Sequence, residues 1–178
     1  PRNPKTQSKM NLKIKYRESF RPFAPSVMFD KADEYFDIGT ESPYMLLVAP
    51  VREKRRNKIN QNHNTNENLL KTINQSRSDI PAVTHIDYSA RVQTINPNDK
   101  QDYYQLISIF EKLTGYGVLV NTSFNVRGEP IVCSPHDAYK CFMRTEMDIL
   151  VLENFILYKE EQPEFTEDIL WRDEYELD

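Results

Sequence analysis

The stretch from Asn121 to Pro130 carries the densest set of side chains that could bind an anion. It reads Asn-Thr-Ser-Phe-Asn-Val-Arg-Gly-Glu-Pro and follows the apolar run 118–120. In α/β proteins, ligands gather where strands end, because loops there can present hydroxyl, amide and guanidinium groups. A plain turn capped by Asn and Ser side chains would use the same residue types, so the spacing leaves both interpretations open. The candidate residues of this stretch are Asn121, Ser123, Asn125 and Arg127.

A second candidate group is basic and lies near the amino end of the chain. It consists of Lys13, Lys15, Arg17 and Arg21. Guanidinium groups bind phosphate oxygens through paired hydrogen bonds, so this cluster could form a phosphate clamp. An ordinary charged surface has the same composition, and spacing alone favours that interpretation.

The third candidate group contains His85, Asp87 and Arg91. An arginine near the start of a predicted strand needs an anionic partner, which is either Asp87 or a phosphate of a ligand. His85 and Asp87 could form an acid–base or metal pair, but no further ligand follows them at zinc spacing. A structural or substrate-orienting histidine is the better interpretation, and no metal site is predicted. The sequence also lacks a Walker loop, a dinucleotide fingerprint and a nucleophile elbow.

Short helices and strands should position these groups. Pro22 and Pro25 exclude a helix and predict an extended segment. Ser26 would then cap a helix that reaches about Phe36 and ends at Gly39. The basic run 52–56 and the Asn-rich stretch after it are expected to form an exposed loop and a weak helix. Without interleaved aromatic residues, a solvated loop is favoured there over nucleic-acid binding.

Apolar periodicity predicts the remaining elements of an α/β fold. The run 45–51 predicts a buried strand, and alternation around 92–94 predicts another. Asn98 or Asp99 should cap a helix that Gly115 ends, and Ser134 should open a second helix with a capping box. The apolar face of the first helix comprises Tyr103, Leu106, Ile107, Phe110 and Leu113, and strands are expected at 118–120, 149–152 and 155–158.

Composition narrows the class of protein. The 178 residues are 39% hydrophobic, which suits one folded domain, and no apolar stretch approaches the length of a membrane span. Two cysteines, Cys133 and Cys141, give no disulfide framework, so a reducing, cytoplasmic setting is expected. Residues 160–178 form an acidic tail of net charge −8, which leaves +4 on residues 1–159 out of the total of −4. We expect this tail to pack little, with the alternative that its apolar residues Phe165, Ile169, Leu170 and Trp171 form one turn that docks on the rest of the protein. A mildly basic body suits anionic ligands, whereas the sequence pI near 5.5 argues against nucleic acid.

Four segments taken together resemble one enzyme family. They are Arg17–Pro25 (REsFRPFAP), Ser42–Val51 (SPYMLLVAPV), Ile80–Ile95 (IPAVTHIDYSARVQTI) and Asn121–Phe142 (NTSFNVRGEPIVCSPHDAYKCF). Their order and spacing resemble the carboxyl-terminal domain of the carbamoyltransferases, which include antibiotic O-carbamoyltransferases and NodU-like nodulation proteins. The resemblance covers residues 1–159. Tyr88 departs from it, because a small residue, usually Gly, is expected at that position.

The resemblance implies a fold and a division of labour. The fold would be a single YrdC-like domain, an open twisted sheet with flanking helices and a concave basic surface. The chain would be a fragment of a longer enzyme whose amino-terminal domain, similar to sugar kinases, holds the acceptor and completes the transfer. Carbamoyl phosphate and ATP, the latter bringing Mg²⁺, would give a carbamoyl-adenylate in the carboxyl-terminal domain.

The resemblance also implies roles for the candidate residues. Arg17, Arg21 and Arg91 would bind phosphate, with Lys15 as a weaker candidate. Asn121, Ser123 and Asn125 would orient the carbamoyl and phosphate groups, Arg127 would steady the nucleotide, and His85 and Asp87 would shape the pocket. Two alternatives stay open: a nucleotide- or RNA-binding module without turnover, and a stand-alone YrdC-type synthase of an amino-acid carbamoyl-adenylate.

Overall fold

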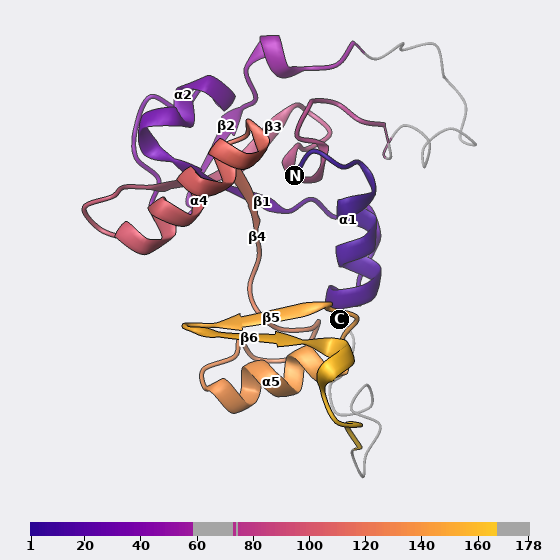
Figure 1. Ribbon diagram of the computed structural model, residues 1–178. Helices are drawn as coiled ribbons and strands as arrows, with labels where there is room; N and C mark the ends of the chain where they lie inside the picture. The colour runs from indigo at the N-terminus through magenta and orange to yellow at the C-terminus, as the bar shows by residue number, and fades with distance from the viewer. Residues whose placement is uncertain (59–72, 74, 167–178) are drawn as a thin grey trace, which may run out of the picture. The chain divides into compact units, whose positions relative to one another are not determined.

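The computed structural model describes residues 1–58, 73 and 75–166 (Figure 1). Its internal contacts divide the chain into two compact units. Unit 1 comprises Pro1–Gln7 and Phe20–Thr122, and unit 2 comprises Ser8–Ser19 and Ser123–Asp178. Each unit combines helices with a β-sheet, so the predicted α/β class is confirmed. The expected weak helix after residue 56 falls mostly on residues 59–72, outside the described residues.

Unit 1 is built on a four-stranded mixed sheet in the order β2-β3-β1-β4. The strands are β1 (Ala24–Met28), β2 (Leu47–Pro50), β3 (Ser89–Ile95) and β4 (Val118–Asn121). β1 runs parallel to β3, while β4 and β2 pair antiparallel with β1 and β3. The strands expected at 92–94 and 118–120 are confirmed. The strand expected at 45–51 forms as β2, but it is an edge strand on which only Ala49 is buried, so its predicted burial was wrong.

The segment after Pro25 corrects one prediction. Ser26 does not cap a helix, because it lies fully buried in β1, opposite Gln93 of β3. Pro25 is the second residue of β1, where it lies opposite Val120 of β4, and the parallel ladder with β3 begins only at Ser26. Helical structure begins only after the strand, with a 3-10 turn at Phe29–Lys31 and α2 (Ala32–Tyr35).

Helix α4 (Gln101–Thr114) forms where periodicity predicts it, and Gly115 ends it with φ of 77°. Its amino end is different from the expectation, because Lys100 occupies the N-cap position and no side chain of Asn98 or Asp99 caps it. Ile107 is buried against Met28 and Ile95 of the sheet. The buried side of α4 is narrower than predicted, since two side chains of the predicted apolar face, Leu106 and Leu113, are exposed.

Unit 2 contains a two-stranded sheet and a helix of ten residues (Figure 1). Helix α1 (Lys5–Met10) enters this unit and continues as a π-helical segment, Asn11–Lys15. Helix α5 (Pro135–Arg144) opens with the predicted capping box, in which Ser134 Oγ accepts from the N–H of Asp137 and the Asp137 carboxylate accepts from the N–H of Ser134. The capping prediction is therefore confirmed.

The remaining strands of unit 2 also match their predicted positions. β5 (Ile149–Leu152) pairs antiparallel with β6 (Phe155–Tyr158). Leu150 is buried on the side that meets α5. Of the acidic tail, residues 160–166 are described, and Phe165 packs edge-on against Tyr139 with ring centroids 6.4 Å apart. This contact agrees with the docking alternative at Phe165, and the last twelve residues of the tail lie outside the described part of the chain.

Candidate functional site

The sheet of unit 1 has a polar half on one face. Ser26 lies opposite Gln93, and side chains two residues apart on a strand point to the same side, so Arg91 shares that face. Asn121 lies opposite Ala24, two residues before Ser26, which places Asn121 on the same face from β4. The other half of this face carries Met28 and Ile95, which α4 covers. The polar half is therefore defined by Ser26, Arg91, Gln93 and Asn121.

The amide of Gln93 links these strands by hydrogen bonds. Its Nε2 donates to the carbonyl oxygen of Pro43 at 3.0 Å. Its Oε1 accepts from Ser26 Oγ at 2.7 Å and from Asn121 Nδ2 at 2.5 Å. Three segments far apart in sequence thus meet at one amide.

Arg91 is exposed on this face, where it lies opposite Val48 of the edge strand β2. Among the described residues its guanidinium has no ion pair or hydrogen bond. Asp87, the protein carboxylate considered as its partner, bonds instead to Ser89. The charge of Arg91 is therefore available to a ligand on this face.

The loop before β3 holds His85 and Asp87 around one serine. Ser89 donates both its backbone N–H and its hydroxyl to Asp87 Oδ1, at 3.0 and 2.7 Å. His85 Nδ1 lies 2.9 Å from the same hydroxyl oxygen. Burial lowers the pKa of His85, and the bonds from Ser89 lower the pKa of Asp87. At neutral pH the loop therefore presents a neutral imidazole and an ionised, locally satisfied carboxylate.

Tyr88 lies in the turn of this loop, where its backbone N–H donates to the carbonyl oxygen of His85 at 3.1 Å. Its φ of 64° lies in the left-handed region, which glycine adopts without steric cost. This backbone conformation accounts for the small residue expected here from the resemblance. The ring of Tyr88 lies 5.3 Å from the guanidinium carbon of Arg56, so the tyrosine has a contact that glycine could not make.

In unit 2, the loop after β4 is organised around Lys15. The Nζ atom of Lys15, whose side chain is buried, lies 2.9 Å from the carbonyl oxygen and 3.1 Å from Oγ of Ser123, and 2.6 Å from the carbonyl oxygen and 2.5 Å from Oδ1 of Asn125. Its three N–H groups are therefore shared among four acceptors. Burial, with a smaller contribution from the charge of Arg17, lowers the pKa of Lys15 to about 8. Lys15 therefore holds residues 123–125 in place from within the unit.

The arginines of unit 2 contact this loop and its surroundings. Arg127 donates its backbone N–H to the carbonyl oxygen of Lys15, and its guanidinium lies 3.7 Å from the carboxylate of Glu18. Arg17 Nε donates to Asn11 Oδ1 at 2.6 Å. Both guanidinium groups thus have protein partners already, unlike that of Arg91.

The structure distributes the predicted residues between the two units. Arg21, His85, Asp87, Arg91 and Asn121 belong to unit 1, whereas Lys15, Arg17, Ser123, Asn125 and Arg127 belong to unit 2. Within unit 1, Arg91 and Asn121 share a sheet face, and His85 and Asp87 share a hydroxyl. Within unit 2, Lys15, Ser123 and Asn125 meet directly. That residues of both units serve one reaction stays a prediction.

Sequence reasoning missed Ser26 and Gln93. Gln93 could have been found, because it follows Arg91 at the spacing of two that keeps side chains on one face of a strand. Ser26 could not, because its hydroxyl suggested a helix cap in place of a central strand.

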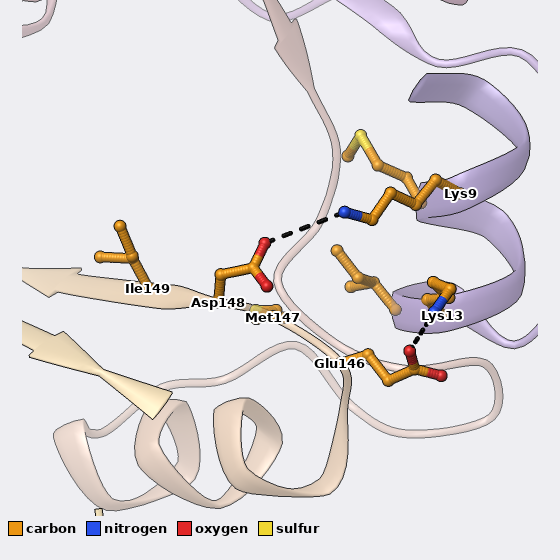
Figure 2. Close-up of a pocket in the computed structure, with 8 residues that line it drawn as sticks. Lys9, Lys13, Glu146, Met147, Asp148 and Ile149 are labelled. Carbon is orange, nitrogen blue, oxygen red and sulfur yellow. Dashed lines mark hydrogen bonds and ion pairs between the residues drawn. The ribbon is translucent and has the colours of Figure 1, made fainter. Parts of the chain in front are cut away.

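The described part of unit 2 also has a groove between the amino-terminal helical segment and the residues that lead into β5 (Figure 2). Lys13 pairs with Glu146, and Lys9 Nζ lies 4.0 Å from Asp148 Oδ2. Of the candidate residues named from the sequence, Lys13 lines this groove and the other ten do not. Lys13 therefore has a carboxylate partner on this groove, and its part in a phosphate clamp stays a prediction.

The basic run 52–56 is likewise balanced by protein groups. Arg52 contacts Asp33 and Asp37 at 3.2 and 2.9 Å, and Arg55 contacts Asp79 at 2.7 Å. Residues 1–58, 73 and 75–166 contain no group of three or more His, Cys, Asp or Glu side chains that could hold a metal ion. No helix in that range has the length and hydropathy of a membrane span.

Comparison with known proteins agrees with these motifs. Residues 1–159 match the family described as Carbamoyltransferase C-terminus. The chain is 59% identical, over its whole length and 29% of the other protein, to an uncharacterised protein of Synechocystis sp.. It is 38% identical to nodulation protein NolNO of Sinorhizobium fredii over 89% of this chain and 21% of that protein. Nodulation protein U of Rhizobium tropici is 37% identical over 65% of this chain and 16% of its own length.

The chain spans less than a third of the length of these curated relatives. The family match nevertheless covers nearly all of the chain, and it includes every residue of the polar half-face and of the loop that Lys15 holds. The chain therefore belongs to the carbamoyltransferase family, as a carboxyl-terminal region of it.

Proposed function

We propose that this chain activates the carbamoyl group for a carbamoyltransferase. It binds carbamoyl phosphate and ATP and forms a carbamoyl-adenylate. The polar half-face of the unit 1 sheet carries this proposal, because Arg91 is exposed there beside neutral hydrogen-bonding groups. An arginine without a protein carboxylate suits a phosphate or carbamate oxygen, and the neighbouring amide of Asn121 adds orientation.

The reaction balances as two steps. Water cleaves carbamoyl phosphate to carbamate and phosphate. An oxygen of carbamate then attacks the α-phosphorus of ATP, and the bond from that phosphorus to the β-bridging oxygen breaks, so pyrophosphate leaves. Carbamate is a poor electrophile, and adenylation gives it a good leaving group for the later transfer.

The residues of both units have stated roles in this proposal. Arg91, Arg17 and Arg21 stabilise phosphate oxygens, whose charge concentrates in the transition state. Asn121, Ser123 and Asn125 orient the carbamoyl and phosphate groups, and Arg127 steadies the nucleotide. Lys15 acts mainly through the loop it holds, because all the acceptors it bonds belong to Ser123 and Asn125. His85 and Asp87 shape the site beside Arg91.

The proposal includes a second domain of the same polypeptide. The relatives are several times longer than this chain, which supports a further amino-terminal domain that holds the acceptor and completes the transfer. Mg²⁺ arrives with ATP, since triphosphates carry it. The metabolite substrates suit a cytoplasmic setting.

The test is pyrophosphate release from ATP by the full-length enzyme, with and without carbamoyl phosphate. We expect release to depend on carbamoyl phosphate and to be independent of threonine and bicarbonate. Arg91→Ala should lower turnover by about 100- to 1,000-fold, as the removal of one charge-stabilising donor does elsewhere. Lys112→Ala, a change of an exposed cation on α4, is the matched control. Wild-type turnover in Arg91→Ala would refute the proposal that the polar half of the sheet face binds the substrate.

A further inference from the structure

We propose that Gln93 is a positioning residue that makes Asn121 present its carbonyl oxygen to the amino group of the carbamoyl substrate. The site would thereby select carbamoyl phosphate over acyl phosphates that lack N–H groups. This inference rests on the proposed function and concerns its substrate specificity.

The direction of the Gln93 amide is set by a backbone group. Gln93 Nε2 lies 3.0 Å from the carbonyl oxygen of Pro43, and a carbonyl oxygen can only accept. The NH₂ end of Gln93 must therefore face Pro43. Its Oε1 then faces β1 and β4, where Ser26 Oγ and Asn121 Nδ2 lie at 2.7 and 2.5 Å. Two bonds use both lone pairs of this oxygen.

The same reasoning carries over from Gln93 to Asn121. Because Gln93 offers an acceptor, Asn121 must turn its NH₂ group toward it. The carbonyl oxygen of Asn121 is then at the other end of its amide, and it forms no hydrogen bond with the described residues. A flip of Asn121 would place two carbonyl oxygens against each other, which is repulsive.

This polarity suits a carbamoyl group beside Arg91. Carbamoyl phosphate combines anionic oxygens, which suit a guanidinium, with an NH₂ group, which can only donate. Asn121 and Arg91 offer one acceptor and one cation on the same sheet face. Acetyl phosphate has the same anionic oxygens and a methyl group in place of the NH₂, so it would leave the Asn121 oxygen without a partner.

The test compares two ligands in the full-length enzyme. Pyrophosphate release gives the KM for carbamoyl phosphate, and competition with it gives the inhibition constant of acetyl phosphate. Asn121→Leu removes the acceptor at similar volume, and Gln93→Met removes the group that orients it. Both variants should raise the KM for carbamoyl phosphate by about 10- to 100-fold, leave the KM for ATP unchanged, and alter acetyl phosphate inhibition little.

Gln93→Glu is the conservative variant. Its carboxylate keeps an acceptor toward Asn121 but loses the bond from Nε2 to the carbonyl oxygen of Pro43. It should therefore preserve the ratio of the KM for carbamoyl phosphate to the inhibition constant of acetyl phosphate, while its charge and the lost bond weaken the binding of both ligands together. Gln105→Met on α4 and Asn98→Leu are matched controls at exposed positions and should change neither constant.

The outcomes separate the two proposals. Wild-type enzyme without carbamoyl-phosphate-dependent pyrophosphate release contradicts the proposed function and overturns both. The second outcome concerns Gln93 alone. If the wild-type enzyme releases pyrophosphate in response to carbamoyl phosphate, but Asn121→Leu and Gln93→Met leave the ratio of the KM for carbamoyl phosphate to the inhibition constant of acetyl phosphate unchanged, the proposed role of Gln93 is wrong. If circular dichroism shows that Gln93→Met is unfolded, Asn121→Leu and Gln93→Glu provide the test instead. A change in the ratio of the two constants in Gln93→Glu would also contradict the inference.

Discussion

The imidazole of His85 and the carboxylate of Asp87 bond to a single oxygen, the hydroxyl of Ser89, at 2.9 and 2.7 Å. A carboxylate can only accept, so the one hydroxyl proton of Ser89 points to Asp87. His85 Nδ1 must then donate its N–H to that oxygen. The lone pair of the neutral imidazole is therefore at Nε2, where a substrate group could donate to it.

The tautomer of His85 can be measured directly. At pH 7 the ring should be neutral, because burial holds its pKa below the ordinary 6.5, and long-range nitrogen NMR should show a protonated Nδ1 and an unprotonated Nε2. Ser89→Ala should abolish this preference and yield a mixture of tautomers. His136 is the internal reference. A protonated Nε2 in the wild type would contradict the assigned direction of the chain of bonds.

Tyr88 gives a prediction about backbone strain. Tyr88→Gly should unfold at a higher urea concentration than Tyr88→Ala, because both lose the contact with Arg56 but only alanine keeps a Cβ in the left-handed region. The difference in free energy of unfolding should be about 1–2 kcal/mol. The same pair of changes at Tyr44, an exposed residue without positive φ, should show the reverse order. Equal stability of the two Tyr88 variants would argue against the conformation described.

Lys15 gives a prediction about pH. Its pKa is about 8 in the folded protein and 10.5 in the unfolded chain, so between these values the unfolded state binds more protons. The free energy of unfolding attributable to Lys15 should therefore rise from pH 8 to pH 10.5. Measured as the difference between wild type and Lys15→Met, this rise should be absent from the control Lys112→Met. A flat difference for Lys15→Met would mean that the ammonium is not buried as described.

The capping box gives a prediction about local stability. Ser134→Ala removes the oxygen that accepts from the N–H of Asp137 and should lower the free energy of unfolding by about 1 kcal/mol. Amide protons in the first turn of α5 should exchange faster. Ser8→Ala, outside any cap of α5, is the control. Unchanged exchange in that first turn would contradict the contribution of the cap.

Arg91 gives a prediction about geometry as well as charge. Arg91→Lys should recover only part of the turnover lost in Arg91→Ala, because an ammonium keeps the charge but lacks the planar fork that binds two oxygens. The readout is carbamoyl-phosphate-dependent pyrophosphate release by the full-length enzyme. Full recovery by lysine would reduce the role of Arg91 to that of a point charge.

Local chemistry made several elements predictable from sequence. The capping box fixed the start of α5, Gly115 fixed the end of α4, and alternation identified β3. Prediction from sequence failed where pairing with strands distant in sequence determines the secondary structure. Ser26 has the side chain of a helix cap, yet the ladders from both neighbours place it in a central strand.

The residues of the candidate site also differ in how far the sequence predicts them. Arg91 and Asn121 were identified from their side-chain types. The importance of Gln93 could not be predicted, because it depends on hydrogen bonds with three residues that are distant in sequence. The bonds of Lys15 to Ser123 and Asn125 join positions more than a hundred residues apart, which no local pattern encodes.

The discontinuous second unit limits how this protein can be shortened. The chain crosses between the units at 7–8, at 19–20 and at 122–123. A stop codon after Thr122 would therefore delete the loop but keep Lys15, whose ammonium would lose every acceptor it now has. Expression of unit 1 alone would require removal of two separate stretches, with Gln7 rejoined to Phe20.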